Sequence, residues 1–166
     1  MESYLERLPA ELEAAIQGAN DEAMQKAPSG KWSSTQILEH LYLSYTGTNK
    51  GIARCLAGGK PLATSATMKQ RVRKLVVIGL GHLPEGIKAP EMVVPYGQRL
   101  DDVRKNIFAE IQKMAAGLDE CERRFGAGTK IMDHPILGPL TAEQWRKLHW
   151  VHGRHHARQI RERIRV

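Results

Sequence analysis

Residues 32–41, WSSTQILEHL, contain the clearest helix start in the chain. Ser33 stands three residues before Gln36, which is the spacing of a capping box. Trp32 and Ile37 flank this pair in the positions of a hydrophobic staple, which fixes the angle at which the chain enters a helix. The pattern predicts a long helix that begins here.

Three other long segments repeat apolar residues every three or four positions, as amphipathic helices do. Loops rich in Gly and Pro separate the segments. The long helices are expected at residues 3–17, 33–56, 100–124 and from 141 to the chain end. A shorter helix is expected at 65–78, a long loop at 79–97 and an irregular segment at 133–140. We therefore predict an all-α helical bundle that forms a single domain over residues 1–166.

The length of the chain, 166 residues, is sufficient for a full hydrophobic core without a metal or disulfide staple, so a bound metal would serve function. Cys55 and Cys121 belong to no disulfide or metal motif. The acidic, amphipathic start does not resemble a secretory signal. The longest apolar stretch, residues 75–83, is far below the roughly 20 residues that cross a bilayer. These features predict a cytoplasmic protein with no membrane partner.

The net charge of +7 could attract nucleic acid, anionic lipid or an acidic small molecule. Much of the excess lies near the end of the last predicted helix, where cations stabilise the negative end of the helix dipole. These residues are Arg154, Arg158, Arg161, Arg163 and Arg165. Aromatic residues do not alternate with them, as they would in a platform that stacks nucleic-acid bases. The sequence therefore predicts no nucleic-acid partner.

Four of the seven histidines fall within residues 149–156 of the last predicted helix. At about 100° per residue, His149, His152, His156 and Gln159 share one face of that helix, and His155 is displaced to one side. His152 and His156 stack on adjacent turns. This spacing lets two imidazoles bind one divalent metal ion.

His40 is the candidate third ligand, because it lies in phase with Ile37 and Leu41 on the inward face of its helix. The alternative is a core histidine whose ring is satisfied by ordinary hydrogen bonds. Helical bundles build metal sites from facing side chains, and three neutral histidines leave positions for water or substrate. We therefore predict a divalent metal site formed by His40, His152 and His156.

Three further residues are candidates for supporting a ligand or contacting substrate. His149 is expected to be either a solvated helix residue or a group that supports the site. His134 either bonds a nearby backbone group or carries protons beside the metal. Gln159 is placed to orient a ligand or a bound water. No catalytic residue can be selected from the sequence.

The segments WS at 32–33, ILEHL at 37–41 and HGRHHARQ at 152–159 resemble those of the DinB/YfiT-like metalloenzymes, and the likeness spans essentially the whole chain. The segment 134–145 is similar to that of an uncharacterised DinB-like subgroup. The resemblance implies a four-helix bundle in up-down-down-up order, with a long crossover between residues 58 and 100.

The resemblance also implies a function. The metal ligands of the family fall on His40, His152 and His156, and the family is associated with nickel, zinc or similar divalent ions. Some members resemble thiol S-transferases that use bacillithiol, mycothiol or glutathione. Nothing in the present sequence marks a pocket for a thiol cofactor, so the transferase expectation depends on fold-level analogy.

Two classes of function are therefore expected. The first is a metal-dependent transferase or hydrolase that delivers a thiolate or water to a small electrophile. The alternative is a non-catalytic metal- or ligand-binding sensor, in which a fourth protein ligand such as His149 would close the site. The expected partner is a small-molecule substrate, and self-association into a homodimer stays open.

Overall fold

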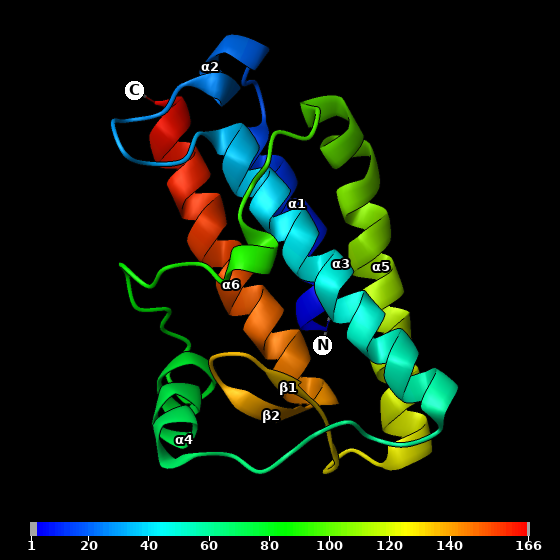
Figure 1. The fold of residues 1–166 in the computed structure, drawn as a ribbon. Coiled ribbons are helices and arrows are strands. Elements are labelled where there is room, and N and C mark those ends of the chain that lie inside the picture. Colours follow the sequence, from blue (N-terminus) through cyan, green and yellow to red (C-terminus); the bar gives the residue numbers. More distant parts are fainter. Residues whose placement is uncertain (1–2, 166) are drawn as a thin grey trace.

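The computed structural model describes residues 3–165 and is built mainly of helices (Figure 1). Residues 75–79 form a π-helical turn, η1, and residues 91–93 form a 3-10 turn, η2. The elements in chain order are α1 (Tyr4–Ile16), α2 (Asp21–Gln25), α3 (Ser34–Gly58), α4 (Met68–Lys74), η1 (Leu75–Gly79), η2 (Glu91–Val93), α5 (Leu100–Phe125), β1 (Lys130–His134), β2 (Gly138–Thr141) and α6 (Ala142–Ile164).

The four long helices α1, α3, α5 and α6 pack against one another and enclose the core. The largest contacts join α3 to α5 and α1 to α6. Burial of an aliphatic side chain contributes about 1.5–3 kcal/mol, so the apolar face of each helix stabilises this packing. The fully buried side chains include Leu5, Leu8, Leu12, Ile37, Leu41, Ile107, Ile111, Met114 and Leu118.

The helix starts predicted from capping boxes are confirmed. The Ser33 hydroxyl accepts a hydrogen bond from the Gln36 N–H (3.2 Å), and the Gln36 side chain accepts one from the Ser33 N–H (2.9 Å). Thr141 and Gln144 make the same reciprocal pair at the start of α6. These caps satisfy backbone donors that the first turn of a helix leaves free.

Two helical glycines allow close packing. A Cβ atom at Gly117 of α5 would lie 2.7 Å from Cγ2 of Ile52 on α3, and one at Gly153 of α6 would overlap the Leu8 side chain of α1. Only the absence of a side chain permits these approaches. Gly153 follows His152 directly, so the contact with α1 also fixes the part of α6 that carries the histidines.

The prediction of an irregular segment at 133–140 is wrong, because it forms most of a hairpin. Strands β1 and β2 pair antiparallel, with His134 opposite Gly138. The segment contains two prolines and a glycine, which disfavour strand interiors, so the sequence did not indicate strands here. The hairpin is stabilised by burial of apolar side chains against the helices, which local patterns do not report; these are Ile131, Met132, Leu137 and Leu140.

A short helix, α2, follows α1 between the helices expected at 3–17 and 33–56. Asn20 caps it, since its side-chain oxygen accepts a hydrogen bond from the Ala23 N–H (2.8 Å). Pro9 lies inside α1. Cys55 and Cys121 are buried free thiols. Within residues 3–165, no helix has both the length and the apolar character of a membrane span.

The crossover between α3 and α5 lies over the side of the molecule formed by α3 and α6 (Figure 1). The π-helical turn η1 packs on α6, where Val77 and Ile78 are buried, and η2 packs on α3. The long loop expected at 79–97 is present and contains η2. The crossover therefore covers the space between the two helices that carry the predicted metal ligands.

Candidate metal centre

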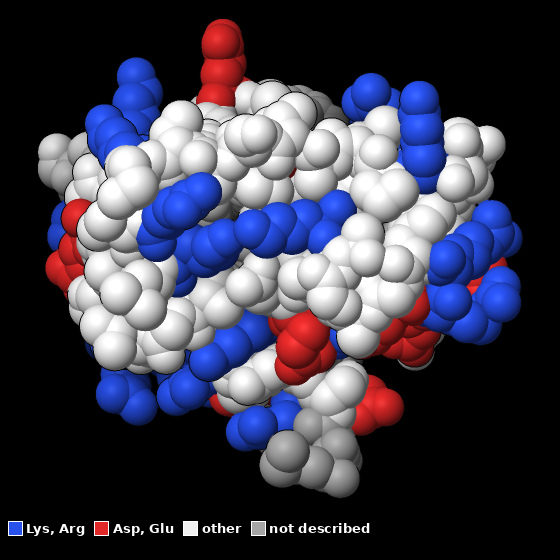
Figure 2. All heavy atoms as spheres, turned by 90° about the horizontal axis from the view of Figure 1, so that it is seen from below, with Lys and Arg blue, Asp and Glu red and all other residues white. Residues whose placement is uncertain are grey.

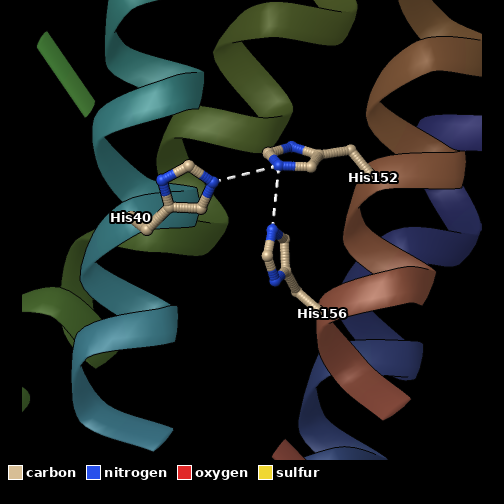
Figure 3. Close-up of side chains that lie close together, drawn as sticks. All are labelled: His40, His152 and His156. Atoms are coloured by element: carbon tan, nitrogen blue, oxygen red, sulfur yellow. Dashed lines mark hydrogen bonds between the residues drawn. The ribbon is translucent and has the colours of Figure 1, made fainter. Parts of the chain in front are cut away.

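Helices α3 and α6 bring the three predicted ligands together (Figure 3). His40 points from α3 toward His152 and His156, which occupy adjacent turns of α6. The Nε2 atom of His152 lies 3.0 Å from Nε2 of His40 and 3.0 Å from Nε2 of His156. One nitrogen from each ring lies within 4.8 Å of the other two. This spacing is short enough for one metal ion to contact all three.

Hydrogen bonds at the far side of two rings determine which nitrogen carries the proton. Nδ1 of His40 lies 2.8 Å from the Val93 carbonyl oxygen, and Nδ1 of His156 lies 2.7 Å from Oε1 of Gln159. Both partners are acceptors, so each Nδ1 must donate a proton. In a neutral imidazole the other nitrogen then has a free lone pair. The Nε2 atoms of His40 and His156 are therefore acceptors.

His152 cannot satisfy both of these acceptors. Its Nε2 atom carries at most one proton when the ring is neutral, and two lone pairs face it at equal distance. If the proton of His152 is on Nδ1, three lone pairs converge on one point. A divalent cation satisfies all three nitrogens at once, and support of each ring through its second nitrogen is the usual arrangement around metal-binding histidines. The donor set therefore fits a metal ion.

Burial keeps the three imidazoles neutral, which is the form that binds a metal. Desolvation lowers the pKa of His40, and desolvation together with the nearby His40 lowers the pKa of His156 to about 3. For His152, desolvation and the neighbouring histidines lower the pKa well below its ordinary value. At neutral pH the three imidazoles can therefore bind a cation without first releasing a proton.

Glu39 is a supporting residue that the sequence analysis missed. Its side chain is 0% exposed, and its carboxylate accepts hydrogen bonds from the backbone N–H groups of Tyr96 (2.9 Å) and Gly97 (3.1 Å). These contacts hold the crossover just beyond Val93, whose carbonyl orients His40. A glutamate beside His40, within the largely apolar run 37–41, was the available signal, because buried carboxylates need partners.

His149 is not one of the converging ligands, and the expectation that it is solvated is wrong. It is 3% exposed, stacks on Trp145, and its Nε2 atom lies 3.0 Å from the Thr48 hydroxyl. Thr48 donates its own proton to the Ser44 carbonyl, so it accepts from His149. Desolvation lowers the pKa of His149 to about 3. This residue supports the wall beside the site as a neutral ring.

His134 bonds nearby backbone groups, which is one of its two expected roles. Its Nδ1 atom accepts hydrogen bonds from the N–H groups of Ile136 (3.2 Å) and Leu137 (3.3 Å). Burial lowers the pKa of His134 to about 4. His155 also stays outside the cluster, since Gln159 donates a hydrogen bond to it (3.1 Å). Gln159 thus orients His156 and joins it to His155.

The three histidines line a cavity of about 1090 Å³. Its walls come from α3, α6, the crossover and the β1–β2 hairpin. His134 and His149 also line it, so all six predicted site residues border the same space. Their roles differ, since three converge on one point, Gln159 orients one of these, and the other two form walls.

Residues 7–163 match a known family whose members are described as proteins of unknown function. The chain belongs to the DUF1569 family. All of the converging histidines of this DUF1569 protein, and the residues that orient them, lie inside the matched region. No curated protein and no solved structure matches the chain.

Proposed function

We propose that this DUF1569 protein is a metal-dependent enzyme that holds a divalent ion on His40, His152 and His156. The observation that carries the proposal is the convergence of the three Nε2 atoms, two of which are held as acceptors by Val93 and Gln159. Nickel and zinc are the proposed ions, because imidazole nitrogen suits both.

We also propose that the fold is a four-helix bundle of the DinB/YfiT type, in up-down-down-up order. Mutual packing of α1, α3, α5 and α6 supports this proposal. The long connection between α3 and α5 supports it as well, because a long connection lets two consecutive helices run in the same direction. Bundles of this kind place metal sites between facing helices, as α3 and α6 do here.

A metal ion at this site would lower the pKa of a bound thiol or water, so that a nucleophile exists at neutral pH. The chain supplies the other requirements. Val93 and Gln159 keep two rings in the correct tautomer, and burial keeps the rings neutral. His149 is bonded to Thr48, which leaves three protein ligands. Three ligands with an open position describe a catalytic site more closely than a structural one.

The cavity beside the histidines supports a small-molecule substrate, since its volume is slightly above the usual range for ligand pockets, roughly 300–1,000 Å³, and so leaves room for one. We propose transfer of a low-molecular-weight thiol, or of water, to a small electrophile. The thiol sulfur forms a bond to the electrophilic carbon. The bond from that carbon to the leaving group breaks, and the leaving group keeps the electron pair. The thiol proton passes to solvent.

The test is an assay of protein purified without nickel resin and loaded with either nickel or zinc. Glutathione, bacillithiol and mycothiol are each supplied with 1-chloro-2,4-dinitrobenzene, and p-nitrophenyl acetate tests hydrolysis. The proposal predicts turnover that His40→Ala abolishes and Lys113→Ala, a surface control, retains. Stoichiometric metal binding without turnover of any of these substrates would favour the alternative, a non-catalytic metal- or ligand-binding module.

A further inference from the structure

One face of α3 borders the cavity along much of the helix. His40, Ser44, Gly47, Gly51 and Arg54 all line it. Their spacing of three or four residues places them in one stripe. At about 1.5 Å per residue, the stripe extends roughly 21 Å from His40 to Arg54. The cavity is therefore an elongated groove. The three histidines lie part-way along it, because Ile37 and Trp32 line it on the side of His40 away from Arg54.

Gly47 keeps this groove open. Glycine is unfavourable in a helix interior, and usually a close contact or an unusual backbone angle explains it. Neither applies here, because a Cβ atom at Gly47 would meet no atom within 4 Å and its φ is not positive. Gly51, one turn further along, differs, since a Cβ atom there would lie 2.7 Å from the Met132 sulfur. The space beside Gly47 belongs to the groove.

The end of the groove far from His40 is cationic. Lys50 and Arg54 line it from α3, and neither forms an ion pair with any residue in 3–165. The last turn of α3 contains no basic residue, so stabilisation of the helix dipole does not account for these charges. Asp133, the acidic residue that lines the groove from the hairpin, accepts hydrogen bonds from Thr64.

Figure 2 shows the end of the molecule that carries α4 and the hairpin. A band of Lys and Arg side chains crosses the middle of this face. The groove wall between this end and the histidines is largely apolar; it includes Leu62, Val72, Val76, Val77, Met132 and Leu137. From the histidines toward Arg54, a ligand in the groove would meet imidazoles, then an apolar wall, then cations without an ion-pair partner in the part of the chain that the structure describes.

We propose that the groove binds an elongated molecule with an apolar body and a terminal carboxylate. The carboxylate lies near Lys50 and Arg54, the body passes Gly47, and the opposite end reaches the three histidines. This inference deepens the proposed function by naming the class of substrate, and only its statement about the reacting end rests on that function. Binding of the body and carboxylate requires no metal.

The test uses decanoate and decanol as probes of metal-free protein, with tryptophan fluorescence as the signal, because Trp32 and Trp145 line the cavity. We expect decanoate to bind at least tenfold more tightly than decanol. Lys50→Ala/Arg54→Ala should remove this preference and leave decanol binding unchanged. Lys105→Ala/Lys113→Ala removes the same charge elsewhere and should change neither. Equal binding of the two probes, or a preference that survives the first double variant, overturns the carboxylate assignment.

Gly47 variants test the path of the body. Gly47→Leu should weaken both probes at least tenfold and leave metal stoichiometry unchanged. Gly47→Ala should weaken them less and raise the melting temperature by about 2–4 °C, since alanine favours the helix. Gly58→Ala, at a position with equal space outside the groove, should raise the melting temperature without affecting either probe. Unchanged probe binding in folded Gly47→Leu and Gly47→Ala overturns the groove assignment, whatever the metal measurements show.

Discussion

The carboxylate of Glu39 accepts two hydrogen bonds from the single backbone N–H of Gly97, each 3.1 Å long. Glu39 is adjacent to His40, and Gly97 follows the turn that presents the Val93 carbonyl to Nδ1 of His40. The buried charge therefore connects the crossover to the metal-binding face of α3. Through Val93, it determines which nitrogen of His40 is free to bind a cation.

This relationship predicts that Glu39→Ala weakens metal binding without removing a ligand. Loss of the carboxylate removes its hydrogen bonds to the Tyr96 and Gly97 N–H groups, which lowers the free energy of unfolding by about 1.5–3 kcal/mol, the usual value for hydrogen bonds to a charged group. Displacement of Val93 should reduce metal affinity about 10–100-fold, as loss of a hydrogen bond that orients a ligand does in other sites. Thermal denaturation and calorimetric metal titration measure the two effects.

Tyr96→Ala is the matched control, because it retains the backbone N–H that Glu39 binds and removes an exposed side chain. It should change neither quantity. If Glu39→Ala destabilises the fold but binds metal with unchanged affinity, then the crossover has no influence on the site.

A second prediction concerns Gln159, whose side-chain oxygen accepts the Nδ1 proton of His156. Gln159→Ala should lower metal affinity about 10–100-fold and preserve a stoichiometry of one ion. His155→Ala breaks only the bond to the other end of Gln159, so its effect should be smaller. Competition against a coloured chelator measures both affinities. A larger loss in His155→Ala than in Gln159→Ala would contradict this order.

The third prediction is a dependence of stability on pH in the metal-free protein. The pKa of His149 is about 3 in the fold, against an ordinary value of 6.5, so the unfolded chain binds one more proton between these limits. The free energy of unfolding is therefore fully retained above pH 6.5 and decreases as the pH falls below it. The slope is at most about 1.4 kcal/mol per pH unit for each such histidine.

His149→Phe removes one titrating group and should reduce this slope. Chemical denaturation between pH 7 and pH 5 measures it. An unchanged slope in the variant would mean that His149 is protonated in the folded protein, in conflict with its buried, neutral environment.

The fourth prediction separates the metal from the fold. A chain with this core should remain folded without its ion, so His40→Ala should lose metal and keep its helical circular dichroism and a cooperative melt. The replacement also alters packing near Trp32, whose ring centroid lies 5.1 Å from that of His40, so the midpoint should change. Unfolding of His40→Ala, or of chelated protein, would make the ion a structural staple.

Local patterns in the sequence predict the long helices well, because their causes are local. Ser33 and Thr141 cap helices through partners three residues away, and the pairing of His152 with His156 follows from helical periodicity. The inward phase of His40 was also visible. A capping box or an apolar helical stripe can therefore be recognised from the sequence alone.

The remaining features depend on contacts between distant segments. The hairpin forms because its apolar residues are buried against helices, which overrides its Pro and Gly content. Burial of His149 follows from the packing of α6 against α3, although its residue type suggests a solvated side chain. The Val93 carbonyl lies 53 residues from His40 in the chain, so no local pattern could pair them.

Metal content of the purified protein tests the central claim most directly. Elemental analysis of protein prepared without nickel resin should find close to one divalent ion per chain. His152→Ala/His156→Ala should lose this ion, whereas His149→Ala should retain it, because His149 bonds Thr48 outside the converging set. Stoichiometric metal that persists in the His152→Ala/His156→Ala variant would contradict the assignment of the site.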